Sequence, residues 1–359
     1  GRTGGAQGQH RHRGGHMIGL LGATGYTGRL VVAELARRGL PARLGGRDPD
    51  RLAALEPSDD PLTERALVDV ADPVALAAFL SGLDAVISCV GPFVKYGDPV
   101  VDAAVAAGVP YVDSTGETTF MAGVYDRHAN AAVPVVPACG FDYIPGDLGA
   151  ALAADLAGGE VARVLVGYHI RGMKASRGTA RSAVGVINEM RFAPRRVLID
   201  FPGGTRSAVT VPWGEEVTVP RFLPGVHVRT AHVVPSLVAH GLGAVGPALP
   251  LAGPLLRFAR PVLEQLVERL PEGPPQSAGG PLDTQIVVHV AGHFGEAAVV
   301  VNVGDAYQVT AALLVESAVR VAAEGCPTGA LTTAQAFEPA EFLDAVSGPL
   351  LSWAQLATS

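Results

Sequence analysis

The sequence predicts an α/β protein with two domains, a doubly wound domain on a parallel sheet and a second α+β domain built on a mainly antiparallel sheet. Short apolar runs alternate with helical segments as far as residue 147. Such alternation implies right-handed crossovers and therefore parallel strands. Beyond residue 147 the predicted strands are longer and alternate apolar with polar residues, as in a sheet with one covered face.

The domain boundaries follow from this change of pattern. A chain of 359 residues is long enough for two cores. We assign residues 17–147 to the first domain and 148–305 to the second, and we expect helices from about residue 306 to 359 to return to the first. Residues 1–16 are glycine-rich and polar, which predicts an unstructured tail, an added segment or a mis-set start.

The first domain carries clear start and stop signals. Met17–Gly22 is predicted as a strand and Gly25–Arg38 as a helix that ends at Gly39. Three more helices are expected where an Asp cap is followed by Pro at the first helical position, at Asp48, Asp72 and Asp98. The remaining strands are predicted at Ala42–Leu44, Ala66–Asp69, Asp84–Val90, Tyr111–Asp113 and Val133–Ala138.

The second domain is expected to begin with a helix over Leu148–Leu156 that leads into its strands. Further helices are predicted at Thr179–Phe192 and Ala306–Ala323, and the tail Ala334–Leu356 is predicted as mostly helical. Its strands are predicted at Ala162–Ile170, Ser207–Val211, Glu216–Val219, Gln285–Ala291 and Ala297–Val303.

Composition narrows the class of protein. The net charge of −7 argues against a nucleic-acid partner, which calls for a basic face. Three widely spaced cysteines without a CxxC pair predict reduced thiols and a cytoplasmic protein. No metal site is predicted, because His289 and His293, although four residues apart, fall on a strand and a turn.

One apolar segment, residues 231–256, resembles a membrane span in composition only. Four prolines interrupt it, and each interior proline removes a helical hydrogen bond, so no span is expected. Packed loops are the favoured interpretation. A hydrophobic lid for an acyl substrate and a peripheral membrane contact remain open.

The strongest motif is the glycine-rich turn Gly22–Gly28, placed between the first strand and the first helix. Gly22 permits a tight turn, Gly25 lets the backbone approach a pyrophosphate, and Gly28 allows close packing of helix on strand. The helix N-terminus offers free N–H groups and the positive end of its dipole to phosphates. This predicts a Rossmann-type dinucleotide site, with Thr24, Tyr26 and Thr27 among its contacts.

The end of the second strand predicts which dinucleotide binds. NAD sites usually place an acid there for the ribose 2′-hydroxyl. Here the strand ends in Gly-Gly-Arg, and Asp48 is expected to cap the next helix instead. Arg47 is left where a 2′-phosphate would lie, with Arg51 one turn further on, and a guanidinium matches phosphate with paired hydrogen bonds. The predicted cofactor is therefore NADP(H).

Five motifs occur in order: GATGYTG at 22–28, GGR at 45–47, SCVGPF at 88–93, YVDSTGE at 111–117 and GFDYIPGDLG at 140–149. Together they resemble the saccharopine dehydrogenase-like oxidoreductases, and within them the bacterial trans-acting enoyl reductases. The sequence departs from that pattern at Arg177, where Gly is usual, and at Tyr143 and Gly146, where Ser is usual.

The resemblance implies a second domain that covers the nicotinamide, and reduction of a C=C or C=N bond with NADPH. Asp69 is then expected near the adenine. The cofactor wall is expected at Cys89, Val90, Gly91 and Pro92, the proton donor among Tyr143, Lys95 and Tyr96, and substrate contacts at Asp142, Ser176 and Thr179. Asp142 is also expected to fix its own loop by capping near Gly146.

The predicted function is NADPH-dependent hydride transfer to a conjugated C=C bond of a small-molecule or acyl substrate. No Tyr has a Lys four residues later, and no GxSxG motif occurs, so short-chain dehydrogenase and hydrolase chemistry are excluded. Reduction of a C=N bond and a non-catalytic NADP(H)-binding regulator stay open. The oligomeric state, including a homodimer, is also left open.

Overall fold

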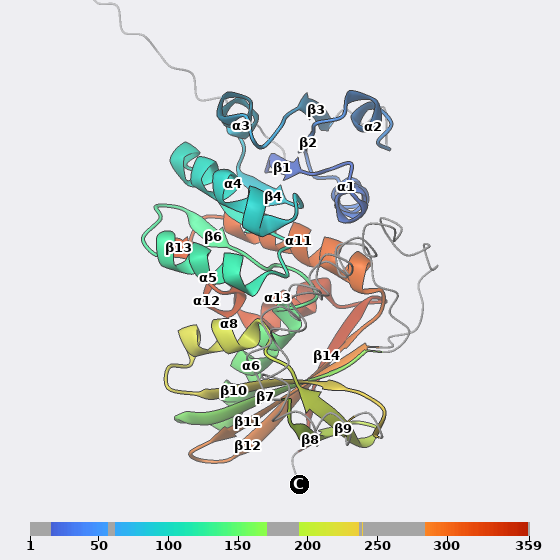
Figure 1. The fold of residues 1–359 in the computed structure, drawn as a ribbon, viewed down its shortest axis with the longest axis vertical. Helices are drawn as coiled ribbons and strands as arrows, with labels where there is room; N and C mark the ends of the chain where they lie inside the picture. Colours follow the sequence, from blue (N-terminus) through green and yellow to red (C-terminus); the bar gives the residue numbers. More distant parts are fainter. Residues whose placement is uncertain (1–15, 57–61, 171–193, 237–238, 240–283, 358–359) are drawn as a thin grey trace, which may run out of the picture.

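The computed structural model describes residues 16–56, 62–170, 194–236, 239 and 284–357. Figure 1 shows two sheets, one in the upper and one in the lower half of the view, with several helices between them. Several predictions lie outside the described residues: nearly all of the tail 1–16, the helix Thr179–Phe192, and the apolar segment from residue 240 onward.

The first sheet has seven strands in the order β13-β6-β5-β4-β1-β2-β3, and every pair in it is parallel. This confirms the doubly wound domain. Its strands are β1 (Ile18–Leu21), β2 (Ala42–Gly46), β3 (Thr63–Leu67), β4 (Ala85–Ser88), β5 (Tyr111–Asp113), β6 (Pro134–Val136) and β13 (Gly329–Ala330).

The second sheet, in the order β14-β12-β11-β7-β10-β9-β8, confirms the mainly antiparallel domain, since only β10 and β7 pair in parallel. Three of its strands, β8, β10 and β14, have no counterpart among the predicted strands. Its members are β7 (Val161–His169), β8 (Arg196–Phe201), β9 (Gly204–Thr210), β10 (His227–Val233), β11 (Thr284–Gly292), β12 (Glu296–Val303) and β14 (Leu351–Leu356).

The helices around the first sheet are α1 (Tyr26–Arg37), α2 (Pro49–Ala53), α3 (Pro73–Leu80), α4 (Phe93–Ala107) and α5 (Thr118–Arg127). Asp48 and Asp72 cap α2 and α3 as predicted. The third predicted start, at Asp98, is wrong. The helix α4 already begins at Phe93 and contains Pro99, while the Asp98 carboxylate pairs with Arg127 of α5.

The remaining helices are α6 (Ile144–Ala157), α8 (Glu215–Phe222), α11 (Ala306–Ala322), α12 (Thr333–Ala336) and α13 (Pro339–Val346). The predicted strand over Glu216–Val219 is wrong, because that stretch is part of α8. Its buried residues Glu215, Thr218 and Val219 recur at helical spacing. The helical prediction for the tail fails at Leu351, where β14 pairs with β12.

Two helices join the domains. The helix α6 leaves the first sheet after β6 and packs on β11 and β12, so closely that a Cβ on Gly149 would lie 2.9 Å from Val288. The helix α11 leaves the second sheet and packs on α1, β4 and β5. One apolar core consequently runs from Leu20 of β1 to Val299 of β12. Among the described residues, no helix is long and apolar enough to cross a membrane.

Candidate functional site

The glycine-rich turn has the geometry that each of its glycines was expected to provide. Gly22 has a φ of +81°, a left-handed conformation, and its N–H donates to the carbonyl of Gly45 at 3.1 Å. A Cβ on Gly28 would overlap the carbonyl oxygen of Gly22. A Cβ on Gly25, in contrast, would meet only that oxygen, at 3.3 Å. Gly28 is therefore needed for packing, and Gly25 faces open space.

The N-terminus of α1 has backbone N–H groups that make no hydrogen bond with a described residue. The backbone N–H groups of Tyr26, Thr27 and Gly28 donate to no described residue, and no side chain caps this helix. The carbonyl of Thr24 accepts a hydrogen bond from the Arg51 guanidinium at 3.0 Å, which ties the turn to α2. Three free donors at a helix N-terminus make a site for an anionic group such as a pyrophosphate.

Arg47 lies directly beyond β2, next to this turn. A Cβ on the preceding residue, Gly46, would lie 3.3 Å from the methyl group of Thr24. The Asp48 carboxylate accepts from the N–H of Arg51 at 3.0 Å and so is used as the cap of α2. Arg47 is exposed, and its guanidinium makes no hydrogen bond or ion pair with a described residue. Its charge is thus available beside the turn.

The ends of β3 and β4 place two further predicted residues at the same edge of the sheet. Asp69 is exposed beyond β3 and accepts from the N–H of Ala71 at 3.0 Å. Cys89 follows β4, and its N–H donates to Leu21 at 2.9 Å. Burial raises the pKa of the Cys89 thiol to about 12. The thiol is therefore protonated at neutral pH. The backbone of Cys89 lies against Gly22, where a Cβ would be 3.0 Å from the Cys89 carbonyl.

The start of α4 is occupied by an acid that sequence reasoning did not single out. Val90–Gly91 and Pro92 lead into the helix, and the Glu117 carboxylate accepts from the N–H groups of Phe93 and Val94 at 2.8 and 2.9 Å. This N-terminus is therefore unavailable to phosphate. An acid four residues beyond β5, in the loop at the carboxyl edge of the sheet, was the signal that could have identified Glu117.

The three predicted proton donors lie in different surroundings. Lys95 is exposed, with its Nζ 4.6 Å from the ring centroid of the half-buried Tyr96. Tyr143 is buried, and its hydroxyl donates to the carbonyl of Gly116 at 2.9 Å. The Tyr143 ring packs against the backbone of Gly214, where a Cβ would overlap it. Lys95 and Tyr96 thus contact each other, whereas the Tyr143 hydroxyl is bonded to the main chain; Tyr96 packs against the apolar cluster that includes Tyr143.

The first turn of α11 forms a wall that the sequence did not predict. The ring of Tyr307 meets the ring of Tyr26 edge-on, with centroids 5.0 Å apart. One turn further along, the Thr310 hydroxyl accepts from the N–H of Phe141 at 3.1 Å. This helix therefore connects the glycine turn to the loop after β6, which carries the GFD motif.

Asp142 of that motif is half-buried and is held by its main chain. Its carbonyl accepts from the Tyr168 hydroxyl at 2.9 Å and from Trp213 Nε1 at 3.3 Å. The predicted cap near Gly146 is wrong, because no side chain caps α6. The Asp142 carboxyl group makes no hydrogen bond or ion pair with a described residue, and burial raises its pKa to about 6.

Two other acids are fully buried close by. The Glu215 carboxyl group is hydrogen-bonded to the Tyr168 hydroxyl, and burial raises its pKa to about 8. Asp147 accepts hydrogen bonds from Thr218 of α8 and Thr333 of α12, and burial raises its pKa to about 7. These acids connect elements that are distant in sequence.

The helix α8 also accounts for the two departures from the family pattern among the described residues. The large ring of Tyr143 faces Gly214, which has no side chain to exclude it. At position 146 a small residue is required, since a Cβ on Gly146 would overlap the carboxyl group of Glu215. Each change in size, just before α6 or in its first turn, is thus matched by a residue at the start of α8, Gly214 as its N-cap or Glu215 as its first residue.

Two predicted substrate residues, Ser176 and Thr179, and the departure at Arg177 lie outside the described residues. The paired histidines make no metal site within the described part of the chain, where no group of three metal-ligating side chains occurs. His289 instead has its Nε2 2.9 Å from the carbonyl of Asp200.

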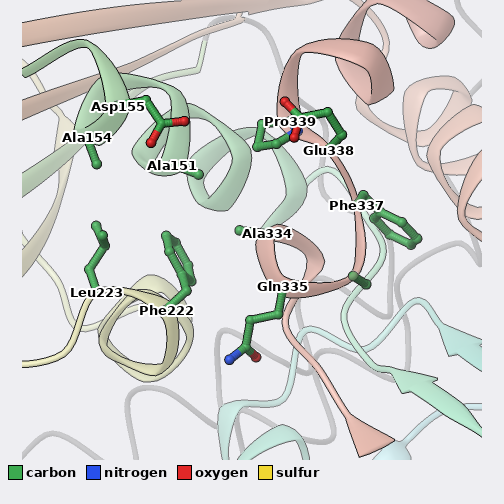
Figure 2. A pocket seen from close by; sticks show the side chains of 11 residues that line it. Ala151, Ala154, Asp155, Phe222, Leu223, Ala334, Gln335, Phe337, Glu338 and Pro339 are labelled. Atoms are coloured by element: carbon green, nitrogen blue, oxygen red, sulfur yellow. The ribbon is translucent and has the colours of Figure 1, made fainter. Parts of the chain in front are cut away.

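A hollow of about 420 Å³ lies elsewhere, between α6, α8 and the start of α13, as Figure 2 shows. It adjoins α12, which follows β13, and β13 is four strand positions from β1 in the sheet. With strands roughly 4.8 Å apart, that offset is on the order of 19 Å. The hollow is therefore separate from the glycine turn, and its lining includes Ala151, Phe222, Leu223, Gln335 and Phe337.

Comparison with known proteins supports the nucleotide site. Residues 22–114 match a family described as NAD(P)H-binding. The trans-acting enoyl reductase of Mycobacterium ulcerans is 38% identical over 140 residues, which are 36% of this chain and 34% of that protein. A probable mitochondrial saccharopine dehydrogenase-like oxidoreductase of Arabidopsis thaliana is 37% identical over 148 residues, covering 36% and 33%. The matched part is about a third of these relatives' length.

The fold has a counterpart among solved structures. Saccharopine dehydrogenase (L-Glu forming) from Saccharomyces cerevisiae superposes with a TM-score of 0.57 over 96% of this chain and 100% of that one, at 15% identity. This likeness concerns the arrangement of both domains, and the sequence matches concern the nucleotide-binding part. Taken together, the sequence matches show an NAD(P)H-binding part similar to that of saccharopine dehydrogenase-like oxidoreductases and trans-acting enoyl reductases, and the structural likeness shows that the fold of both domains resembles that of a saccharopine dehydrogenase.

Proposed function

We propose that this protein is an NADPH-dependent reductase that transfers hydride to a conjugated C=C bond of an acyl or related small-molecule substrate. The observation that carries the proposal is the pair formed by the glycine turn, with its free N–H groups, and the exposed Arg47 beside it. The C=C bond is favoured by the similarity to proteins named trans-acting enoyl reductases.

The residues present fit a dinucleotide. Open space at Gly25 admits a close approach to the backbone, and the N–H groups of Tyr26 and Thr27 would hold the pyrophosphate. Arg47 would pair with a 2′-phosphate, because Asp48 is used as a helix cap. When bound, the cofactor supplies the hydride; the protein binds and orients the reactants and excludes water.

Preference for NADPH tests the role of Arg47. We expect Arg47→Ala to weaken NADPH binding at least tenfold and to change NADH binding little, since one charge-assisted phosphate contact contributes roughly 1.5–3 kcal/mol. Titration followed by nucleotide fluorescence measures both. Arg163→Ala, which removes an exposed arginine from β7 in the other domain, is the matched control. Equal losses for NADPH and NADH would remove Arg47 from this role.

The substrate class is tested with two panels, conjugated enoyl thioesters and preformed imines, by following NADPH consumption. Turnover of enoyl thioesters supports the proposal. Turnover of imines alone supports the C=N alternative, which the likeness in fold to a saccharopine dehydrogenase favours. Tight NADPH binding without turnover on either panel would favour a regulatory protein.

A further inference from the structure

The loop Gly140–Asp142 is held from both domains. On one side the N–H of Phe141 donates to Thr310 of α11 at 3.1 Å. On the other side the carbonyl of Asp142 accepts from Tyr168 of β7 at 2.9 Å and from Trp213, before α8, at 3.3 Å. The position of the Asp142 main chain is therefore fixed by three separate elements.

The Asp142 side chain differs from the buried acids around it. Asp113 accepts from the N–H groups of Thr115 and Ala138, and Glu215 and Asp147 have hydroxyl partners. Asp142 is half-buried, and its carboxyl group has no hydrogen bond or ion pair with a described residue. An acid with a rigid main chain and an unused carboxyl group is available to a ligand.

The location of Asp142 suits such a role. It follows β6 at the carboxyl edge of the first sheet, where ligands bind in doubly wound folds. Thr310, which holds its loop, lies one helical turn from Tyr307, and Tyr307 contacts Tyr26 of the glycine turn. A dinucleotide seated on that turn would have its reactive end at the same edge of the sheet.

We propose that Asp142 is the general acid of the reduction, an inference that rests on the proposed function. Hydride adds to the electron-poor carbon of the substrate, and the π electron pair moves to the carbon next to the carbonyl group. The O–H bond of Asp142 breaks as its proton goes to that carbon. The substrate gains two electrons, the cofactor is oxidised, and the Asp142 carboxylate is reprotonated by water.

The surroundings of Asp142 make its carboxyl group half-protonated near pH 6. Burial raises the pKa of Asp142 to about 6, near the working range of a general acid. His232, which stacks on Tyr168, has a pKa lowered to about 4 by burial and stays neutral above that pH. The titratable groups around it are Tyr143, Tyr168, Glu215, Asp147 and His232.

A binding experiment tests the location without turnover. The oxidised nicotinamide ring is cationic and the reduced ring is neutral, so an Asp142 carboxylate beside it favours NADP⁺. In wild-type protein we expect the ratio of the NADP⁺ and NADPH dissociation constants to fall about fivefold from pH 5 to 8. Both nucleotides carry the 2′-phosphate, so the effect of its protonation on the two dissociation constants cancels in their ratio. In Asp142→Asn it should stay flat, and in Asp155→Asn it should follow wild type.

A flat ratio in wild-type protein, or the same fall in Asp142→Asn, would overturn the inference and leave the proposed function standing. Absence of binding of either nucleotide to wild-type protein would overturn both. Given a substrate that reacts, Asp142→Asn should lower kcat about 100-fold or more with the NADPH dissociation constant unchanged. Wild-type kcat should fall tenfold per pH unit well above pH 6, and a variant with full kcat and that same profile would contradict the assignment.

Discussion

At the scale of single residues, Asp147 makes stability depend on pH. Its carboxyl group is buried on α6 between Thr218 and Thr333, and burial raises its pKa from 3.8 to about 7. Between these values the folded chain retains a proton that the unfolded chain has released. The stability this provides is fully present below pH 4 and is lost as the pH rises through 7.

We expect Asp147→Asn to reduce this loss, by at most about 1.4 kcal/mol for each pH unit in that window. Urea unfolding at pH 5 and pH 7.5, with far-UV circular dichroism as a check of folding, measures it. Asp155→Asn, on the exposed side of the same helix, should behave like wild type. An unchanged pH dependence in Asp147→Asn would show that this carboxyl group ionises as freely in the folded chain as in the unfolded one.

The local geometry of the candidate nucleotide site was largely predictable, because its features are formed by residues close together in the sequence. A glycine-rich turn between a strand and a helix, and an arginine beside a capping acid, are readable within a few residues. Glu117, Tyr307 and Tyr168 were not found, since each acts on a segment far away in the sequence. Nothing in the local pattern of Tyr307 indicates that it meets Tyr26.

At the scale of secondary-structure elements, the prediction that Asp72 caps a helix was correct, and the same prediction for Asp98 was wrong. The Asp72 carboxylate accepts from Val74 and Ala75 at the start of α3, at 2.9 and 3.2 Å. We expect Asp72→Ala to cost about 1 kcal/mol of unfolding free energy. Asp98, inside α4, has only a half-exposed ion pair with Arg127, so Asp98→Ala should cost less than about 1 kcal/mol and less than Asp72→Ala. Urea unfolding compares the two, and equal losses would contradict the capping assignment.

The errors at this scale have a common cause. An Asp-Pro pair signals a helix start, but the Glu117 carboxylate already satisfies the first N–H groups of α4, so the helix begins earlier. The segment Glu216–Val219 is rich in β-branched residues, yet burial at helical spacing and the contacts of Glu215 with β7 make it a helix. In both cases a tertiary contact overrides a local preference.

At the scale of the whole molecule, α6 and α11 and a shared core should make the domains unfold together. Both tryptophans, Trp213 and Trp353, lie in the second domain or at its edge, whereas the nucleotide is expected on the first. Tryptophan fluorescence and far-UV circular dichroism should give one midpoint. NADPH at 100 times its dissociation constant should stabilise both signals by about 2.7 kcal/mol. Separate midpoints, or a fluorescence midpoint that NADPH leaves unmoved, would contradict this coupling.

The two-domain architecture was predictable from the alternation of patterns, and the strand order of the second sheet was not. That order places β7, β10 and β11 side by side although Val161–His169 and Thr284–Gly292 are far apart in the chain. A strand as short as Gly329–Ala330 carries no periodic signal, yet it completes the edge of the first sheet. Long-range pairing of this kind depends on the packed core.

The central claim is that the turn at the head of α1 receives a pyrophosphate, and Gly25→Ala tests it most directly by calorimetric titration with NADPH. The added methyl group would meet only the Gly22 oxygen, so the fold should be retained while the approach of phosphate to the backbone is blocked. We predict one saturable site in wild type and in Gly295→Ala, a glycine where an added Cβ would meet nothing within 4 Å, and a loss of affinity of at least tenfold in Gly25→Ala. No saturable binding to wild type, or wild-type affinity in Gly25→Ala, would contradict the account.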